Sequence, residues 1–277
     1  MCGRYAAGKE RDALAVEFEV DSATSRHLPA RWNIAPTAPI YIVKESGDGG
    51  IPARELTVAA WGLVPSWAAD ISIGGKMANA RCETVGQKPS FRSAFARRRC
   101  LVPVDGWYEW AAADMTIAAK ARPPKQPYYF CAPPTSGAST ALAGIYEWWR
   151  DPTDPDAEPL LSAAIITTDA YGDLAKVHTR TPVIVPPSMW TQWLNPHPST
   201  PAATVLAELV AALPDTPVTI HPVSTRVNSA RIDDAGLVVP IDLSAQAVTG
   251  IAAPAGRMGE RLTQPDAADA PGQSFLF

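Results

Sequence analysis

The sequence predicts an α+β fold in which short helices flank a mainly antiparallel sheet or barrel. Many short segments rich in Val, Ile, aromatic and small residues are bounded by Pro, Gly or Asp, a pattern typical of strands. These segments follow one another closely, without a long helix between each pair, which favours antiparallel pairing. Apolar residues make up 47% of the 277 positions, enough for one sizeable core with embellishments.

The predicted helices are short and lie before and between the predicted strands. Residues 9–18 form an amphipathic helix, and Phe91 and Phe95 mark another. Thr200 and Pro201 precede apolar residues at helical spacing, so we expect a helix there with Thr200 as its N-cap. The predicted strands are residues 40–44, 56–61, 100–104, 128–132, 141–148, 160–167, 182–185 and 218–223.

These elements are expected to form one domain over residues 1–245, followed by a flexible tail over 246–277. The tail is rich in Ala, Gly, Pro and Asp and has few large apolar side chains, so it buries too little apolar surface to fold. Two polar or Pro-rich stretches, residues 111–127 and 150–159, are predicted to be loops between strands.

Composition excludes several classes of protein. A net charge of −4 excludes a basic nucleic-acid coat protein, although a local basic groove stays open. No run of about 18 apolar residues occurs, so no membrane span is expected. The N-terminus lacks the apolar region of a secretion signal, and the four cysteines form no CxxC pair. We therefore expect a cytoplasmic protein without a metal or other cofactor.

Basic residues gather between residues 76 and 100, where seven of them accompany one acidic residue, Glu83. This stretch is either a solvated helix face or a groove that follows nucleic-acid phosphates. Most of the nearby aromatic residues are expected to pack in the core, and one or two to stack on unpaired bases. They are Trp61, Trp67, Trp107, Tyr108 and Trp110.

Cys2 directly follows Met1, and an initiator methionine is commonly removed when the second residue is small. The product would carry an α-amine and a thiol on adjacent carbons. The amine condenses with an aldehyde to an imine, and the thiol closes on the imine carbon to form a thiazolidine. The α-amine pKa is roughly 7.7–8.0, so about a tenth is nucleophilic at pH 7. The alternative is that Cys2 is an ordinary small residue in a frayed terminus.

Three further residues are candidates for chemistry. Glu109 lies between two aromatic residues on a predicted strand, where partial desolvation would raise its pKa and suit proton transfer. Strand alternation could equally place it on the solvent face. His178 precedes a strand and is either a proton carrier or a plain polar residue. Asn79 has no distinctive feature by itself, and sequence spacing cannot show that these residues meet.

A series of motifs occurs in a fixed order along the chain. They are residues 1–5 (MCGRY), 31–36 (RWNIAP), 61–67 (WGLVPSW), 79–84 (NARCET), 91–110 (with RCLVP and DGWYEW), 167–170 (TTDA), 178–183 (HTRTPV) and 221–224 (HPVS). This order resembles the SRAP family (SOS-response-associated peptidase), whose members sense abasic sites in single-stranded DNA. The resemblance covers about residues 2–230.

The resemblance implies a compact α+β domain around a twisted, barrel-like sheet, acting as a monomer. It implies Cys2 as the covalent residue, with Asn79, Glu109 and His178 around it. The positions that would contact DNA or shape the site are Arg4, Asn33, Arg81 and Arg180, and Trp67 would form an aromatic wall near the DNA.

The expected function is therefore covalent capture of abasic sites through Cys2 after removal of Met1. The thiazolidine would shield the lesion from strand cleavage, whereas an imine alone permits lyase-type β-elimination. Three alternatives stay open: a thiol autopeptidase that releases a residue or leader ahead of Cys2, a Cys-dependent hydrolase, and a non-catalytic module that binds single-stranded DNA. We expect the protein to act at the DNA of a bacterial cell.

The last residues of the tail suggest a partner. Gln273, Leu276 and Phe277 resemble the Gln-x-x-Leu-Phe peptides that bind bacterial sliding clamps by inserting an apolar pair from a flexible tether. A chance apolar pair at the C-terminus is the alternative.

Overall fold

The computed structural model describes residues 2–46, 53–111, 125–154, 156–197 and 199–243. The chain divides into two units, residues 1–241 and 242–277, and the following concerns the first. The predicted tail, the domain boundary at residue 245 and most of the predicted loop over 111–127 lie outside the described residues.

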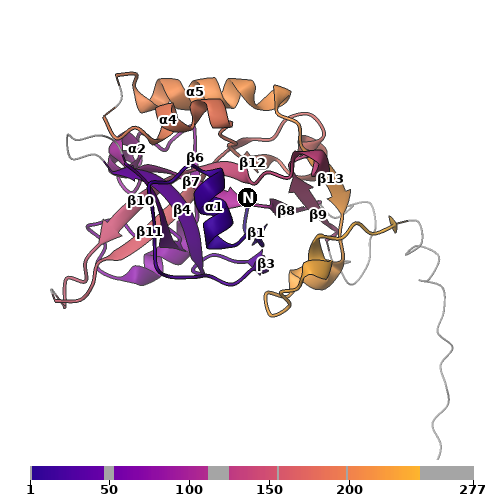
Figure 1. Ribbon diagram of the computed structural model, residues 1–277, viewed down its shortest axis with the longest axis horizontal. Coiled ribbons are helices and arrows are strands. Elements are labelled where there is room, and N and C mark those ends of the chain that lie inside the picture. The colour runs from indigo at the N-terminus through magenta and orange to yellow at the C-terminus, as the bar shows by residue number, and fades with distance from the viewer. Residues whose placement is uncertain (1, 47–52, 112–124, 155, 198, 244–277) are drawn as a thin grey trace, which may run out of the picture. The chain divides into compact units, whose positions relative to one another are not determined.

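The larger of two sheets contains most of the predicted strands (Figure 1). Its order is β12 (Arg180–Pro182), β11 (Leu160–Asp169), β10 (Thr140–Trp149), β7 (Arg99–Val104), β4 (Pro39–Ser46), β5 (Ala53–Trp61) and β2 (Ser22–Ala23), and β6 (Asn79–Arg81) pairs with β11. Strand β11 also pairs with β5, through Ser162 with Ala60 and Ala163 with Trp61. Because this pairing joins distant strands of the sheet over only two residue pairs, the sheet is barrel-like rather than a fully closed barrel.

The smaller sheet is entirely antiparallel and has the order β13 (Thr219–Pro222), β9 (Pro127–Cys131), β8 (Gly106–Trp110), β1 (Arg4–Ala7) and β3 (Arg31–Ile34). One residue, Asp105, separates β7 of the larger sheet from β8 of the smaller one. Glycine is required at the next position, because a Cβ on Gly106 would lie 2.4 Å from the Phe130 carbonyl oxygen.

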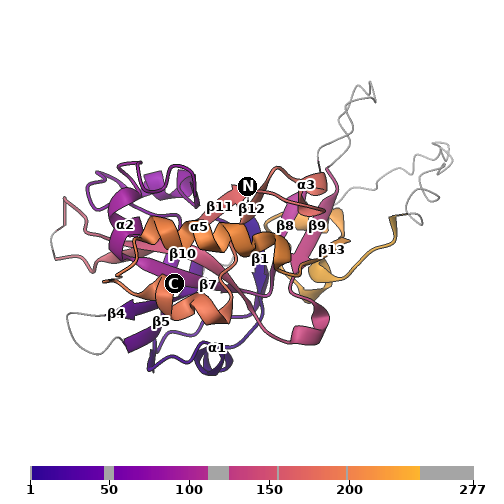
Figure 2. The ribbon, with the colours of Figure 1, turned by 90° about the horizontal axis from the view of Figure 1, so that it is seen from above.

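Helices cover the sheets and are short. They are α1 (Arg11–Glu17), α2 (Arg92–Arg97), α3 (Leu174–Val177), α4 (Trp190–Leu194) and α5 (Ala202–Ala212), with 3₁₀ turns η1 (Ile71–Lys76), η2 (Pro134–Ser136), η3 (Pro187–Met189), η4 (Leu213–Asp215), η5 (Thr225–Asn228) and η6 (Ala235–Val238). Helix α5 lies beside α4 across the larger sheet (Figure 2), and buries Val205, Leu206 and Leu209. Within the described residues, no helix has the length and apolar character needed to cross a membrane.

The two sheets share an apolar core. One buried cluster contains Tyr5 of β1, Trp107 of β8, Trp61 of β5 and Ile165 of β11. The rings of Tyr5 and Trp61 lie 5.0 Å apart, a distance at which aromatic pairs attract one another. Cys2 belongs to the same cluster, so the start of the chain is anchored where the two sheets meet.

The predicted α+β class and mainly antiparallel pairing are confirmed, as two sheets rather than one. Two local predictions are wrong. The strand expected at 182–185 ends at Pro182, and beyond it only an isolated bridge joins Ile184 to Leu142. Thr200 is not the N-cap of α5, because Pro201, with φ −55° and ψ 139°, occupies that position.

Candidate active site

Cys2 and Asn79 meet although 77 positions separate them. The Asn79 side-chain Nδ2 donates a 2.7 Å hydrogen bond to the Cys2 carbonyl oxygen. Asn79 is placed by the parallel pairing of β6 with β11, where it lies opposite Ile165. The Cys2 side chain is fully buried. The backbone at position 2 is therefore fixed by a side chain from the other sheet.

Glu109 faces the interior, which resolves the alternative that the sequence left open. Side chains alternate along β8, so Glu109 shares a face with Trp107, and it is 2% exposed. Arg4 lies opposite Tyr108 in the β1–β8 register, so the residues just before Arg4 run beside Glu109. The carboxyl group thus lies near Cys2.

His178 approaches the same carboxyl group from the end of α3. Its Nδ1 lies 3.7 Å from Glu109 Oε2, and it accepts a 3.0 Å hydrogen bond from the Arg180 backbone N–H. The same Nδ1 lies 3.2 Å from the Arg180 carbonyl oxygen, so both backbone groups of Arg180 face this nitrogen. Burial lowers the pKa of His178, which favours the neutral ring at pH 7. The side chain is 27% exposed, so the imidazole links the buried carboxyl group to solvent.

The environment sets the protonation states of the site. Burial raises the pKa of Glu109 to about 7, so that its carboxyl group exchanges a proton near neutral pH. Burial, and then the negative charge of Glu109, raise the pKa of the Cys2 thiol well above its ordinary value. At neutral pH the sulfur is therefore a protonated thiol beside a carboxyl group that is partly ionised.

The sequence of the whole domain carries a family signature. A family model described as SOS response associated peptidase (SRAP) matches residues 1–230. The chain belongs to the SRAP family. This SRAP chain is 32% identical over 240 residues to "Abasic site processing protein YoqW" of Bacillus subtilis, an alignment that covers 86% of this chain and 99% of that protein.

Other matching proteins are less similar in sequence. "Abasic site processing protein HMCES" of Rattus norvegicus is 28% identical over 285 residues, with 88% of this chain and 77% of that protein covered. A solved structure of a protein from Bacteroides thetaiotaomicron has the same fold, with a TM-score of 0.69 at 23% identity. The match covers 87% of this chain and 100% of that protein.

Arg4 and Asn33 of this SRAP chain hold strands together. Asn33 is fully buried, accepts a 2.7 Å hydrogen bond from Arg4 Nη1, and donates to the carbonyl oxygens of Ser229 and Ile232 at 3.0 and 2.7 Å. Arg4 Nη1 also donates to the Val227 carbonyl oxygen at 2.9 Å. These bonds tie β1 and β3 to η5 and to the segment that follows it.

Replacing Asn33 with alanine should lower the free energy of unfolding by about 2–4 kcal/mol, because it leaves the carbonyl oxygens of Ser229 and Ile232 and the Arg4 guanidinium without their buried amide partner. Urea unfolding measures this change. The control is Asn228→Ala, which removes one exposed side-chain bond to Trp110 and should cost less than about 1 kcal/mol. Equal losses for the two variants would contradict the structural role of Asn33.

Arg180 holds His178 through its backbone N–H, and ion pairs hold the Arg180 side chain in turn. Its guanidinium pairs with Glu83 at 2.6 Å and Asp169 at 2.5 Å and donates to the Thr167 carbonyl oxygen at 2.8 Å. The hydrogen bonds from Arg180 lower the pKa of Glu83 to about 2, so this carboxylate stays charged. Arg180 is 8% exposed, and its charge is shared with two carboxylates. Sequence reasoning assigned no role to Glu83 or Asp169, although both lie within the motifs quoted for the family.

The basic stretch offers fewer free cations than its composition suggested. Arg99 is buried and donates to the carbonyl oxygens of Phe95 and Trp193, and Arg98 pairs with Glu147 at 2.5 Å. The cations that stay exposed are Lys76, Arg81, Lys88, Arg92 and Arg97.

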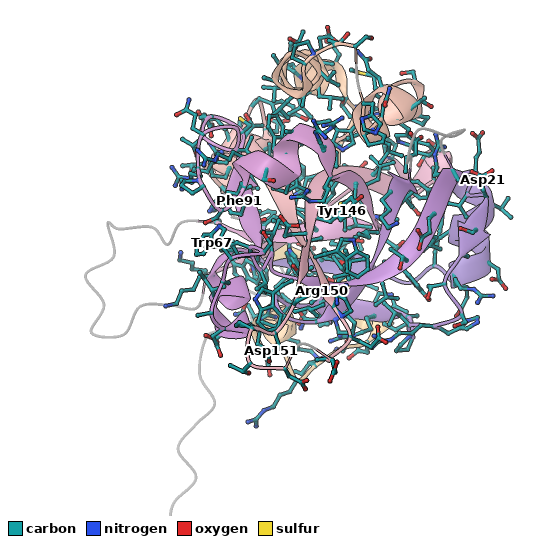
Figure 3. The ribbon with its side chains drawn as sticks, turned by 90° about the vertical axis from the view of Figure 1, so that its left-hand side faces the viewer. Asp21, Trp67, Phe91, Tyr146, Arg150 and Asp151 are labelled. Atoms are coloured by element: carbon teal, nitrogen blue, oxygen red, sulfur yellow. The ribbon has the colours of Figure 1, made fainter. Side chains whose placement is uncertain are left out.

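Trp67 lies on the face seen in Figure 3 and is 61% exposed. Its backbone neighbour Ala68 is buried in a small cluster with Val64 and Trp149, and the Ala68 carbonyl oxygen accepts a hydrogen bond from the Trp149 indole at 2.7 Å. The loop is therefore fixed while the Trp67 ring stays available, an arrangement suited to stacking on an unpaired base.

The charged side chains of the site do not form a metal centre. Within the described ranges, no group of three or more His, Cys, Asp or Glu residues is arranged to hold a metal ion.

Proposed function

We propose that this protein captures abasic sites in single-stranded DNA covalently, through the α-amine and thiol of Cys2 after removal of Met1. The names of its SRAP relatives support the substrate class. The observation that carries the chemistry is the buried Cys2 beside the Glu109 carboxyl group, whose pKa is about 7.

The raised thiol pKa makes the amine the first nucleophile. Ionised Glu109 removes a proton from the terminal ammonium, and the free amine attacks the aldehyde carbon of the opened sugar. A C–N bond forms, and the carbonyl oxygen leaves as water, which gives an imine. The sulfur then adds to the imine carbon, and the thiol proton passes to the nitrogen. The product is a thiazolidine, formed with the net loss of one water molecule.

His178 and Asn79 support these steps in different ways. The neutral imidazole of His178 is partly open to solvent and moves the proton that opens the closed sugar. Asn79 holds the Cys2 carbonyl group and so fixes the direction of the amine two bonds away. Ring closure removes the imine before β-elimination can cut the strand, so the lesion is shielded.

The strand is held by surface contacts around this site. Trp67 stacks on a base beside the lesion, and the exposed cations of the 76–100 stretch, Arg81 among them, follow the phosphates. Non-covalent capture consequently weakens as salt rises, because each phosphate contact releases counterions.

The competing functions fit the site less well. A Cys-dependent hydrolase or autopeptidase needs a thiolate nucleophile, and burial beside Glu109 favours the protonated thiol. A non-catalytic binding module has no use for a carboxyl group with a pKa of about 7 next to a buried cysteine.

The mass of the adduct tests the proposal. Protein incubated with a single strand that carries one abasic site should yield a species equal to the protein without Met1 plus the DNA, minus one water. The species should resist borohydride, since a thiazolidine has no imine to reduce. A non-cleavable N-terminal extension should block its formation, and full capture by a chain that retains Met1 would contradict the proposal.

The C-terminal residues Gln273, Leu276 and Phe277, which lie outside the described residues, are proposed to bind a sliding clamp. A clamp should be retained by the full chain and lost by a chain that ends at Gly272, with abasic-site capture unchanged. Retention by the shortened chain would contradict this partner.

A further inference from the structure

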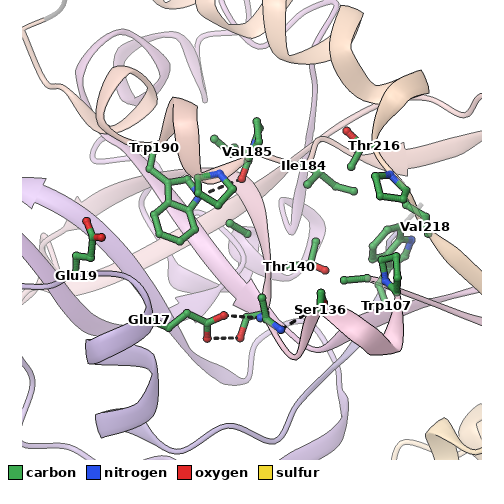
Figure 4. A pocket seen from close by; sticks show the side chains of 18 residues that line it. Glu17, Glu19, Trp107, Ser136, Thr140, Ile184, Val185, Trp190, Thr216 and Val218 are labelled. Carbon is green, nitrogen blue, oxygen red and sulfur yellow. Dashed lines mark hydrogen bonds between the residues drawn. The ribbon is translucent and has the colours of Figure 1, made fainter.

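The pocket shown in Figure 4 is lined by residues other than those of the candidate active site. It has a volume of about 470 Å³, and its described lining is mostly apolar, with Trp190 and Val218 among its walls. The lining also includes the carboxylates of Glu17 and Glu19. Because these carboxylates would repel the phosphates of DNA, the pocket is not part of the proposed DNA-binding surface. Support for the proposed reaction comes instead from charged side chains beside His178.

The Arg180 side chain joins two segments of the chain that carry residues of the site. His178 lies two positions before Arg180, and its Nδ1 faces the N–H and the carbonyl oxygen of Arg180 at 3.0 and 3.2 Å. Asn79 begins β6, and Glu83 follows the end of that strand by two positions. The guanidinium of Arg180 binds Glu83, so one side chain links the segment of His178 to the segment of Asn79.

The pairing of Arg180 with Glu83 is a two-point contact. Arg180 Nη1 donates to Glu83 Oε1 at 2.6 Å, and Nη2 donates to Glu83 Oε2 at 3.0 Å. A parallel pair of charge-assisted hydrogen bonds fixes the orientation of a guanidinium as well as its position. Asp169 binds the same guanidinium through Nη1 alone, and its side chain is 83% exposed, so we expect it to contribute less.

Glu83 lies in a turn that is itself held to the larger sheet. The Cys82 N–H donates to the Thr167 carbonyl oxygen of β11 at 2.8 Å, and the same oxygen accepts from Arg180 Nη2 at 2.8 Å. Val85, on the other side of Glu83, is buried in the core. The carboxylate is therefore presented from a fixed backbone, and it resists displacement of Arg180.

We propose that Glu83 is a positioning residue for His178. Its carboxylate holds the Arg180 side chain, and the Arg180 backbone sets the direction of the imidazole. The ring is then aimed to relay a proton from the C1′ hydroxyl to the ring oxygen of the abasic sugar as the C1′–O4′ bond breaks, which frees the aldehyde. This inference rests on the proposed function, because opening of the sugar is the step assigned there to His178. A misplacement of about 1 Å can cost about 100-fold in rate, so a residue that does not touch the substrate can control this step.

Two single strands separate the opening of the sugar from the later steps. One carries a natural abasic site, which is mostly closed. The other carries an open-chain aldehyde on an alkyl linker that lacks a hydroxyl group and so cannot close. Glu83→Gln keeps the size of the side chain, but its amide nitrogen cannot accept from the guanidinium, so one arm of the contact is lost. The variant should capture the natural site about 10-fold more slowly than the parent, and the open-chain strand within about twofold of the parental rate.

The control is Asp173→Asn, which removes an exposed ion pair with Lys176 at the start of α3 and leaves Arg180 unchanged. It should match the parent on both strands. Glu83→Gln added to His178→Ala should cause no further slowing on the natural site, because the two residues act in one step. In NMR spectra of the full chain without DNA, Glu83→Gln should shift the imidazole signals of His178, and Asp173→Asn should not. Thermal unfolding checks that each variant folds.

Three results would each overturn this role of Glu83: equal slowing on both strands, unchanged capture of the natural site, or further slowing of the His178→Ala protein. Imidazole signals of His178 that stay unchanged in Glu83→Gln would overturn it as well. A parent protein that captures neither strand would contradict the proposed function instead. The imidazole signals, which need no DNA, then still test whether Glu83 positions His178.

Discussion

Replacing Cys2 with alanine should abolish the stable adduct with abasic DNA, a loss of at least about 100-fold on a denaturing gel. Alanine leaves a terminal amine but no sulfur, so any imine it forms stays reversible. Serine at this position should behave alike, and both variants should yield an adduct only when borohydride is present to reduce the imine. More strand cleavage is also expected, because the imine persists long enough for β-elimination.

The control is Cys131→Ala, since this half-buried cysteine lies on β9 in the smaller sheet and contributes nothing to the proposed reaction. It should form the adduct at the parental rate. A stable adduct from Cys2→Ala without reductant would show that another nucleophile reacts, and the terminal aminothiol would have to be given up.

Replacing Glu109 with glutamine should slow adduct formation by about 100- to 1,000-fold at pH 7, because the isosteric amide cannot accept the proton of the ammonium. The parental rate should rise with pH through about 7, where the carboxyl group ionises. The variant should lack this rise near pH 7 and should gain rate only as the α-amine itself loses its proton, at a pKa of roughly 7.7–8.0. Gel time courses from pH 5.5 to 8.5 measure both, and a parallel pH profile for the two proteins would remove Glu109 from the proton transfer.

The same substitution should stabilise the fold at alkaline pH. The folded state keeps the Glu109 proton up to a pKa of about 7, whereas the unfolded chain loses it near 4.5. Stability therefore falls as pH rises between these values, by about 3 kcal/mol in full. Glu109→Gln should remove that fall. In urea unfolding, the free energy of unfolding of the variant should be higher than that of the parent at pH 8 and nearly the same at pH 4.5.

The order of motifs predicted the family. Which residues meet in the candidate site could be seen only in the folded structure. The proposed reactivity of Cys2 follows from its position in the sequence alone. The burial of Glu109 depends on which face of β8 turns inward, and a single strand that can be buried on either face does not specify this. Asn79 reaches Cys2 only because β6 pairs in parallel with β11, a contact between segments far apart in the sequence.

The basic stretch shows the same limit in its charges. Arg98 and Arg99 look equivalent to Arg97 in the sequence, yet the carbonyl oxygens that bind Arg99 come from α2 and α4, and the carboxylate that pairs with Arg98 comes from β10. Local composition counts cations, and only tertiary structure shows which of them are already paired.

The late assembly of the Cys2 site has a consequence during translation. Asn79 and His178 reach their places only with β11 and β12 present, so roughly 180 residues must leave the ribosome first. At about 5–20 residues per second, this takes roughly 10–40 s. Throughout that interval a nascent chain trimmed of methionine would expose its aminothiol to metabolic aldehydes, and prompt folding then shelters the sulfur.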